Sequence, residues 1–220
     1  MIIGIIATIV IIVGGVFLMS KDSGSTSTPT KVSDNLLVTD SSYKTSGVVN
    51  GNYLEASSSA KLTITEFGDF ECPACGQYHP LVKQLLTDFS GKINFVFRNF
   101  PLTQHKNAQI ASQAAEAAGL QGKYWQMHDK LYESQSDWET ASDAKGVFIS
   151  YAEKLGVDVN KFKIDIDSSA IKNKIQSDTN DGNLAKVDAT PTYYINGVKI
   201  EDLPGSYAEF KDLITEQLNK

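Results

Sequence analysis

The sequence predicts an α/β fold in which a helical block is inserted between two halves of a β-sheet, preceded by one transmembrane helix. Three observations support this prediction. Strand-like, β-branched runs lie within residues 61–97 and again within residues 192–200. Between them, residues 103–185 carry apolar side chains at helical spacing. An uncharged apolar run occupies most of residues 1–20.

The N-terminal run, Ile2–Met19, predicts an uncleaved signal anchor over residues 1–20. At about 1.5 Å per residue, a helix of this length just spans a hydrocarbon core of roughly 30 Å. A cleaved signal peptide would have a basic start, a shorter apolar core and a small-x-small cleavage site, and none of these is clear. No cysteine follows the run, which excludes a lipoprotein. Lys21 beside Asp22 leaves the sidedness of the anchor open.

Residues 21–50 are predicted to form a flexible linker and a lead-in to the folded domain. Ser20–Thr30 is rich in Ser, Thr, Gly and Pro and cannot bury a core. Residues 31–59 contain small apolar clusters, which indicate an ordered lead-in with one short strand. The main domain is expected over residues 51–220, with its helical insertion at about 103–185.

The first half of the domain reads strand, helix, strand. Lys61–Phe67 alternates apolar and polar residues and predicts a strand. Gly76–Phe89 has apolar residues at helical spacing, and Pro80 inside it is expected to kink the helix. Ile93–Phe97 predicts the second strand.

The rest of the chain reads as a helical block, a hairpin and a closing helix. Asn160–Asp167 is ambiguous. Asn196-Gly197 is a strong hairpin signal between two short strands. The helices are predicted over Ala108–Ala118, Tyr124–Tyr132, Ala144–Leu155, Ile171–Leu184 and Ser206–Asn219, and the hairpin strands over Thr192–Ile195 and Val198–Ile200.

Composition excludes two classes of protein. The net charge is −6 and no basic stretch could neutralise a run of phosphates, so nucleic-acid binding is not expected. The 220 residues contain only 2 cysteines, which cannot form the framework of a small disulfide-rich scaffold. A bridge between such close neighbours closes a tiny loop and adds little stability through chain entropy.

The two cysteines form a Cys72-Pro73-Ala74-Cys75 motif between a strand and a helix. A helix N-terminus stabilises a thiolate, because unpaired N–H groups and the helix dipole favour negative charge there. Proline suits the first helical turn. Cys75 is then placed to attack a mixed disulfide formed at Cys72.

Two other interpretations of the pair remain open. One is half of a zinc site, since His79 gives a C-x2-C-x3-H spacing. Structural zinc needs four ligands, however, and only His105 and His128 remain as obvious donors. The other is a pair of buried cysteines that act as small apolar residues.

Two further features could contribute to a redox site. Glu66 shares a strand face with Ile64, so it could point inward, carry a raised pKa and shuttle a proton for the inner cysteine; alternatively it is a solvated edge residue. Thr190-Pro191 precedes a strand. A cis bond there would expose the Thr190 backbone to an extended polypeptide, although an ordinary trans turn is commoner.

Four segments together resemble the DsbA-like branch of the thioredoxin superfamily. The tethered form is most similar to the membrane-anchored DsbA-like proteins of bacteria with a single membrane. The resemblance implies a thioredoxin-like fold with an inserted helical domain. The segments are EFGDFECPACGQYHP, AAEAAGLQGKYWQMHDKLYESQ, ATPTYYINGV and GSYAEFKDLI.

The resemblance implies roles for individual residues. Cys72 would be the attacking cysteine, Cys75 the resolving cysteine, and Glu66 the buried acid near it. Pro191 would be a cis-proline and Thr190 would contact substrate. The residues expected to bind substrate are Thr190, Pro191, Pro73 and Ala74.

Two tryptophans and Ala74 differ in how they match the family. Trp125 matches the packing core of the insertion, whereas Trp138 has no match and is expected at the surface or in a loop. Strongly oxidising relatives often carry histidine where this chain has Ala74. We therefore expect a Cys72 pKa below that of free cysteine but above the value of about 3.5 known for DsbA, and a milder oxidant.

The implied function is extracytoplasmic thiol–disulfide exchange that introduces disulfides into exported proteins. The expected partners are unfolded polypeptides with free thiols, a quinone-linked reoxidase of the DsbB or VKOR type, and the cell membrane through a single-pass anchor. A monomer without metal or organic cofactor is expected. The alternatives are a disulfide reductase or isomerase with the same residues, and a thioredoxin-like chaperone or binding module.

Overall fold

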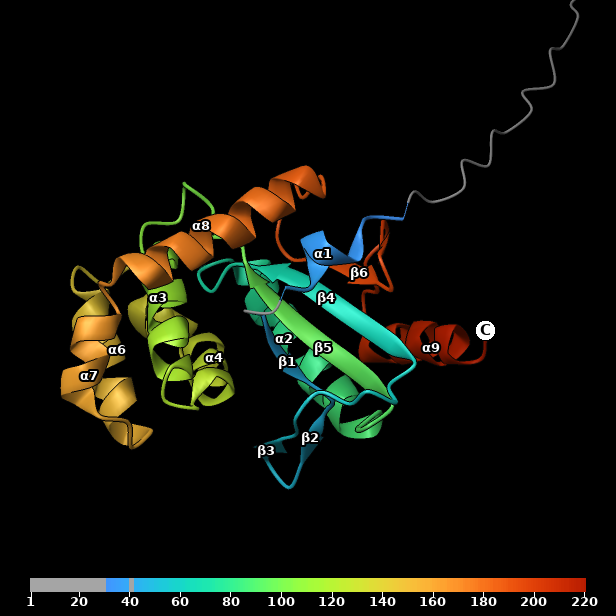
Figure 1. Ribbon diagram of the computed structural model, residues 1–220, viewed down its shortest axis with the longest axis horizontal. Coiled ribbons are helices and arrows are strands. Elements are labelled where there is room, and N and C mark those ends of the chain that lie inside the picture. The colour runs from blue at the N-terminus through green and yellow to red at the C-terminus, as the bar shows by residue number, and fades with distance from the viewer. Residues whose placement is uncertain (1–30, 40–41) are drawn as a thin grey trace, which may run out of the picture.

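The computed structural model describes residues 31–39 and 42–220 (Figure 1). The predicted anchor over residues 1–20 and the linker Ser20–Thr30 lie outside these residues. Within the described ranges, no helix combines the length and the apolar character needed to cross a membrane.

A five-stranded sheet forms the centre of the domain, in the order β1-β5-β4-β6-β7. The central strands β4 and β5 are parallel, and every other pair in the sheet is antiparallel. Nearly all residues of β4 and β5 are buried, as expected for strands covered on both faces. The bounds are β1 Tyr43–Thr45, β4 Leu62–Gly68, β5 Ile93–Asn99, β6 Thr192–Ile195 and β7 Val198–Lys199.

Helices cover the two faces of the sheet, and successive residues of β4 point to opposite faces. Ile64 belongs to the larger core cluster, which includes side chains of α2 (Pro73–Asp88) and α9 (Tyr207–Leu218). Phe67 belongs to a smaller cluster on the opposite face, with residues near α1 (Asp34–Leu37). The predicted strand–helix–strand order is therefore confirmed.

The helical insertion packs at one end of the sheet (Figure 1). Its helices agree with the predicted ranges to within a few residues, and the ambiguous segment Asn160–Asp167 proves to be mostly helix α7. The bounds are α3 Ala108–Gly119, α4 Tyr124–Glu133, α5 Gln135–Trp138, α6 Ala144–Lys154, α7 Val159–Asp165 and α8 Ser169–Leu184.

The prediction for Trp138 is wrong. Its side chain is fully buried at the end of α5, where its indole N–H donates to the Leu131 carbonyl at 2.9 Å. The ring meets Phe148 edge to face, with 5.1 Å between centroids. A tryptophan can be buried at little polar cost when its N–H finds a partner, and α5 supplies that position.

The lead-in contributes more structure than the single strand expected. Besides α1, it forms β1 and a small hairpin of β2 (Val48–Val49) and β3 (Asn52–Tyr53). Strand β1 pairs with β5 at the edge of the main sheet. The domain boundary predicted at residue 51 therefore falls after elements that already belong to the fold.

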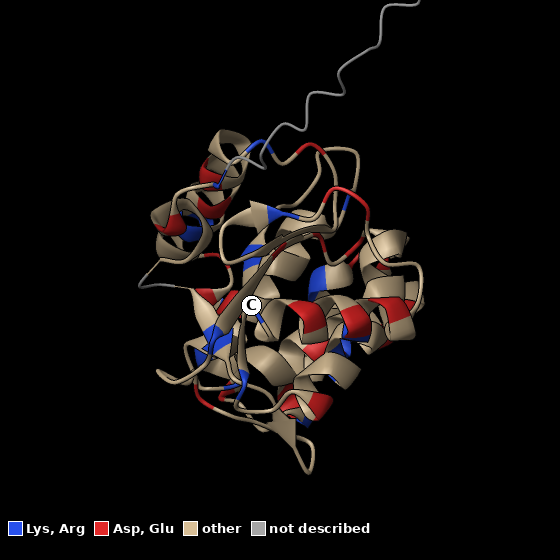
Figure 2. Cartoon of the chain, turned by 90° about the vertical axis from the view of Figure 1, so that its right-hand side faces the viewer, with Lys and Arg blue, Asp and Glu red and all other residues tan. Residues whose placement is uncertain are grey.

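A buried ionic network joins the insertion to the sheet. Arg98 on β5 is fully buried, and its guanidinium donates to Asp178 at 2.8 Å and to Asp181 at 2.6 Å, both on α8. It also donates to the Leu36 carbonyl at 2.8 Å. Elsewhere, basic and acidic residues are interspersed along the described helices (Figure 2).

Candidate active site

The cysteine motif lies where β4 gives way to α2. A short loop leaves the strand, Cys72 is the N-cap of α2, and Pro73 occupies the first helical turn. Cys72 has extended backbone angles, φ −70° and ψ 122°, as an N-cap residue requires. Both cysteines are free thiols and both are buried, Cys72 at 7% exposure and Cys75 at 0%.

The environment of Cys72 favours its thiolate and lowers its pKa to about 5. The largest cause is a hydrogen bond from the Cys75 thiol. Burial opposes this, whereas the Thr190 side chain and the backbone N–H groups of Cys75 and Ala74 reinforce it. This pKa lies between that of free cysteine and the DsbA value of about 3.5, as the sequence predicted.

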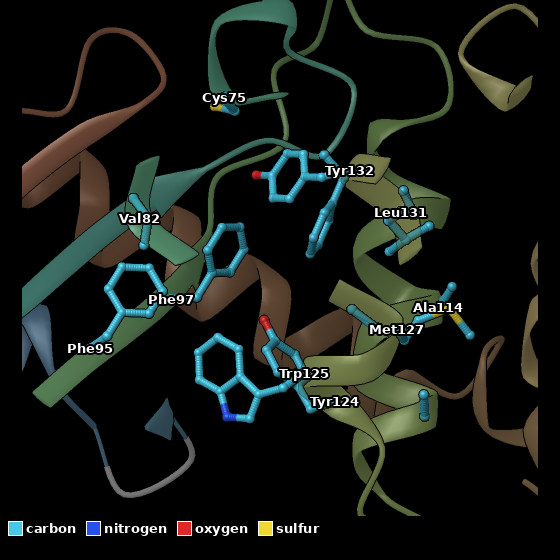
Figure 3. Close-up of a cluster of buried hydrophobic side chains, with 14 of the residues drawn as sticks. Cys75, Val82, Phe95, Phe97, Ala114, Tyr124, Trp125, Met127, Leu131 and Tyr132 are labelled. Atoms are coloured by element: carbon cyan, nitrogen blue, oxygen red, sulfur yellow. The ribbon is translucent and has the colours of Figure 1, made fainter. Parts of the chain in front are cut away.

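Cys75 has the opposite properties. Burial, the hydrogen bond to Cys72 and the nearby Glu66 carboxyl raise its pKa well above the ordinary value. It lies at one end of a buried aromatic cluster that includes Tyr132 and Phe97 (Figure 3). The two thiols therefore share one negative charge, which resides on Cys72 at neutral pH.

Glu66 is buried on β4, as the inward-pointing interpretation predicted, at 3% exposure. Burial raises the pKa of its carboxyl to about 8. Tyr193, its partner across the β4–β6 pair, partly opposes this rise, and Cys72 adds to it. The carboxyl is thus protonated at neutral pH and close enough to both thiols to affect their charges.

The Thr190-Pro191 peptide bond is cis, as the family resemblance implied. It lies immediately before β6. The Cys72 sulfur is 3.3 Å from the Thr190 carbonyl oxygen, to which Cys72 donates when it is protonated. The fold therefore brings together the helix N-terminus and the cis-proline loop. All of the site residues expected from the sequence gather here, with Pro73 exposed and Ala74 half-buried between the cysteines.

The loop before Cys72 is held by polar residues whose role the sequence did not reveal. Asp69 is fully buried, and its carboxylate accepts hydrogen bonds from the backbone N–H groups of Glu71 and Leu102, both at 2.8 Å. The same carboxylate pairs with His105 Nδ1 at 2.7 Å. Glu71 in turn accepts from the Asn107 N–H. These two carboxylates tie the loop to the start of the insertion.

Gln135 was also missed by sequence reasoning. It lies at the start of α5, and its side-chain amide donates to the carbonyls of Phe70 and Cys72 at 2.7 and 3.0 Å. A glutamine with no apolar periodicity, distant in sequence from the cysteines, offered no signal of this contact.

The zinc interpretation finds no support in this geometry. In the described part of the chain, the one group of three potential ligands is His79, His128 and Asp129, which includes neither cysteine. The Asp129 carboxylate already accepts from Tyr53 at 2.6 Å and pairs with Lys83 at 2.8 Å. The cluster is a partly buried ion pair packed among aromatic rings.

A dithiol at a helix N-terminus, opposite a cis-proline and beside a buried acid, defines a redox site of the thioredoxin fold. The fold in this chain contains an inserted helical domain. A family model described as Thioredoxin matches residues 53–216, and the chain belongs to this family.

Solved structures of the same fold are similar to this chain. BdbD from Bacillus subtilis, in its oxidised form, is 26% identical with a TM-score of 0.64, covering 75% of this chain and 91% of BdbD. The α-DsbA1 protein of Wolbachia pipientis is 20% identical with a TM-score of 0.68, covering 84% and 95%. The latter likeness shows a shared fold.

Curated relatives match the domain within much longer proteins. A protein named Na(+)/H(+) antiporter NhaA 1 from Salinispora arenicola is 42% identical over 139 residues, and one named NhaA 3 from Salinispora tropica is 39% identical over 139 residues. Each match covers 63% of this chain but 20% of the relative. The chain thus corresponds to about a fifth of the length of these relatives.

Proposed function

We propose that this protein is an extracytoplasmic thiol–disulfide oxidoreductase that introduces disulfides into exported polypeptides. The observation that carries the proposal is the difference in acidity between the two thiols. The pKa is lowered at Cys72 and raised at Cys75. A low pKa stabilises the reduced state and makes Cys72 a good leaving group, and both effects favour transfer of the disulfide to a substrate.

The reaction begins from the Cys72–Cys75 disulfide. A substrate thiolate attacks Cys72 Sγ, a mixed disulfide forms, and Cys75 leaves with the electron pair of the broken bond. A second substrate thiolate then attacks the substrate sulfur of the mixed disulfide and releases Cys72 as a thiolate. The substrate loses two electrons and gains a disulfide, and the enzyme is left as the dithiol.

Glu66 is the candidate proton donor for this exchange. Cys75 must take up a proton as it leaves, because its buried thiolate is disfavoured. The Glu66 carboxyl is buried nearby and, with a pKa of about 8, holds a proton at neutral pH. In the reverse direction the ionised carboxylate accepts the proton from Cys75.

Substrate polypeptide would bind along the cis-proline loop. The Thr190 carbonyl, which contacts Cys72 Sγ at 3.3 Å, belongs to the backbone edge just ahead of β6. An extended chain that pairs with this edge by strand addition places its own cysteine beside Cys72. Pro191, Pro73 and Ala74 form the rest of the expected contact surface.

The proposed setting is the outer face of a membrane, with the protein a monomer held by the anchor over residues 1–20. The apolar run supports this, and so does the match to segments of proteins named as ion antiporters. A quinone-linked membrane partner of the DsbB or VKOR type would restore the disulfide, and the enzyme itself would need no metal or organic cofactor. Because Ala74 supplies no cation beside Cys72, the enzyme would be a milder oxidant than DsbA.

Trapping thiols in living cells tests the direction of electron flow. Cells are quenched in acid, free thiols are alkylated with a reagent of known mass, and the full chain is resolved by size. We expect most of the protein to be oxidised and unlabelled. Wild type reduced before alkylation marks the doubly labelled position, and Cys72→Ser marks the singly labelled one. A pair found mostly reduced would contradict an oxidase and support a reductase.

A further inference from the structure

The Gln135 side chain forms hydrogen bonds to the loop between β4 and α2, on both sides of Glu71. Its Nε2 donates to the Phe70 carbonyl at 2.7 Å and to the Cys72 carbonyl at 3.0 Å. Gln135 belongs to α5, in the helical insertion, and the two carbonyls belong to the loop that connects β4 to α2. One side chain of the insertion therefore contacts the backbone of the nucleophilic cysteine.

The position of Gln135 is itself fixed. Trp138, at the other end of α5, is fully buried and donates its indole N–H to the Leu131 carbonyl at 2.9 Å. The side-chain amide of Asn107 donates to the carbonyls of Trp138 and Glu139, both at 3.0 Å. These contacts hold the backbone of α5 in place and keep the Gln135 side chain within reach of the two carbonyls.

The first turn of α2 leaves room for this amide. A Cβ at Gly76 would lie 2.9 Å from Gln135 Oε1, so any side chain at this position would push the amide away. The Gly76 N–H donates to the same Cys72 carbonyl at 3.1 Å and closes the first turn. That carbonyl thus accepts one bond from the helix and one from the insertion.

We propose that Gln135 is a positioning residue that holds Cys72 in its N-cap conformation. In that conformation the Cys72 sulfur receives hydrogen bonds from the Cys75 thiol and from the N–H groups of Cys75 and Ala74. Gln135 does not contact the sulfur and acts through the Cys72 peptide group. The inference rests on the proposed role of Cys72 as nucleophile.

Gln135→Met in the reduced full chain tests this inference, because methionine keeps the length of the side chain and removes the donor. Thiolate absorbance is followed against pH, together with the rate of reaction with a small disulfide probe near pH 5. We expect the Cys72 pKa to rise by about one unit, from about 5, since hydrogen bonds to a thiolate account for shifts of this size. The thiolate fraction at pH 5 then falls about fivefold, and the rate falls about two- to fivefold because the more basic thiolate is a better nucleophile.

Gln113→Met is the matched control. Gln113 is also a buried insertion glutamine, and it donates to the Ile166 carbonyl at 2.8 Å, outside the active-site loop. The Gln113→Met variant should leave the Cys72 pKa and the rate of reaction with the disulfide probe unchanged. Circular dichroism establishes folding, and Gln135→Ala replaces the methionine variant if that one does not fold.

Two results would overturn the inference. One is a wild-type pKa and rate in the Gln135 variants. The other is an equal shift in Gln113→Met, which would indicate general loosening of the insertion. A wild-type Cys72 whose pKa equals that of free cysteine would instead contradict the proposed function.

Discussion

Cys72 and Cys75 are the same residue type three positions apart, yet their surroundings give them opposite acidities. Cys72 at the helix N-terminus accepts hydrogen bonds, whereas Cys75 one turn further in is fully buried beside a carboxyl. The sequence predicted the lowered pKa of Cys72 from its place before a helix. It could not predict the largest cause, which is the hydrogen bond from Cys75, because that depends on side-chain geometry.

Removing this hydrogen bond should raise the Cys72 pKa. In reduced Cys75→Ala the donor is lost, and we expect a rise of about one unit, measured by thiolate absorbance against pH. Cys75→Ser is the matched control, because its hydroxyl can still donate and should give a smaller rise. An unchanged pKa in the alanine variant would show that the helix N-terminus alone sets the acidity of Cys72.

Glu66 should make the protein less stable as the pH rises. Its pKa is about 8 in the folded state and that of an ordinary carboxyl when unfolded, so between these values only the folded state holds the proton. The unfolding free energy therefore falls as pH rises through this window. Glu66→Gln should be more stable than wild type at pH 7 by about 1–3 kcal/mol, with the difference shrinking towards pH 4. Chemical denaturation of the reduced protein at both pH values measures this.

The same variant should slow exchange, because glutamine cannot transfer a proton to or from Cys75. We expect the rate at neutral pH to fall about tenfold or more. Glu116→Gln is the control, since Glu116 is another buried carboxyl, with a pKa of about 7, next to Lys174 rather than the cysteines. Equal rates in wild type and Glu66→Gln would remove Glu66 from the mechanism.

At the scale of elements, hydrophobic periodicity predicted the helices and central strands well, and the Asn196-Gly197 turn located the hairpin, whereas short segments without such a signal were missed. Strand β1 has three residues and is stabilised by its pairing with β5, a long-range contact that no local pattern reveals. Helix α5 has four residues, and its burial of Trp138 likewise depends on the packing of α4 and α6 around it. The loop contacts of Asp69 and Gln135 were missed for the same reason.

The junction between α8 and β5 offers a prediction at this scale. Arg98→Met should lower the unfolding free energy by about 3 kcal/mol, the lower end for a broken buried pair, because the buried Asp178 loses one of its two cations and keeps Lys174 at 3.0 Å. The exposed Lys145–Asp167 pair is the control, and Lys145→Met should change stability by less than about 1 kcal/mol. Denaturant unfolding measures both, and a similar small effect for the two variants would contradict this account of the junction.

For the whole molecule, two kinds of information could be read from the sequence. The order of elements and four motif segments predicted the thioredoxin-like fold with its insertion, which the structure and the family match confirm. The anchor and the outer location remain predictions from the composition of Ile2–Met19. Large domains cross membranes largely regardless of flanking charge, so Lys21 and Asp22 do not decide the orientation.

Fractionation tests the anchor. The full chain should remain with the membrane through a high-salt wash, because about eighteen apolar residues suffice to span it. A chain without residues 1–30 should be released. Protease added outside intact cells should digest the domain of the full chain. Recovery of the full chain in the soluble fraction, or protection from external protease, would contradict the proposed setting.

Capture of a mixed disulfide shows whether Cys72 is the nucleophile of the exchange reaction. Reduced full-length Cys75→Ala is mixed with a peptide that carries a disulfide, and the products are mapped by mass spectrometry. The Cys72 thiolate attacks the disulfide, one peptide sulfur leaves as a thiolate, and without Cys75 the mixed disulfide cannot be resolved internally. We expect a stable, reductant-sensitive adduct at Cys72, formed with a half-maximal rate at a pH set by the Cys72 pKa. Exchange that persists in Cys72→Ser, or the absence of an adduct at Cys72, would contradict it.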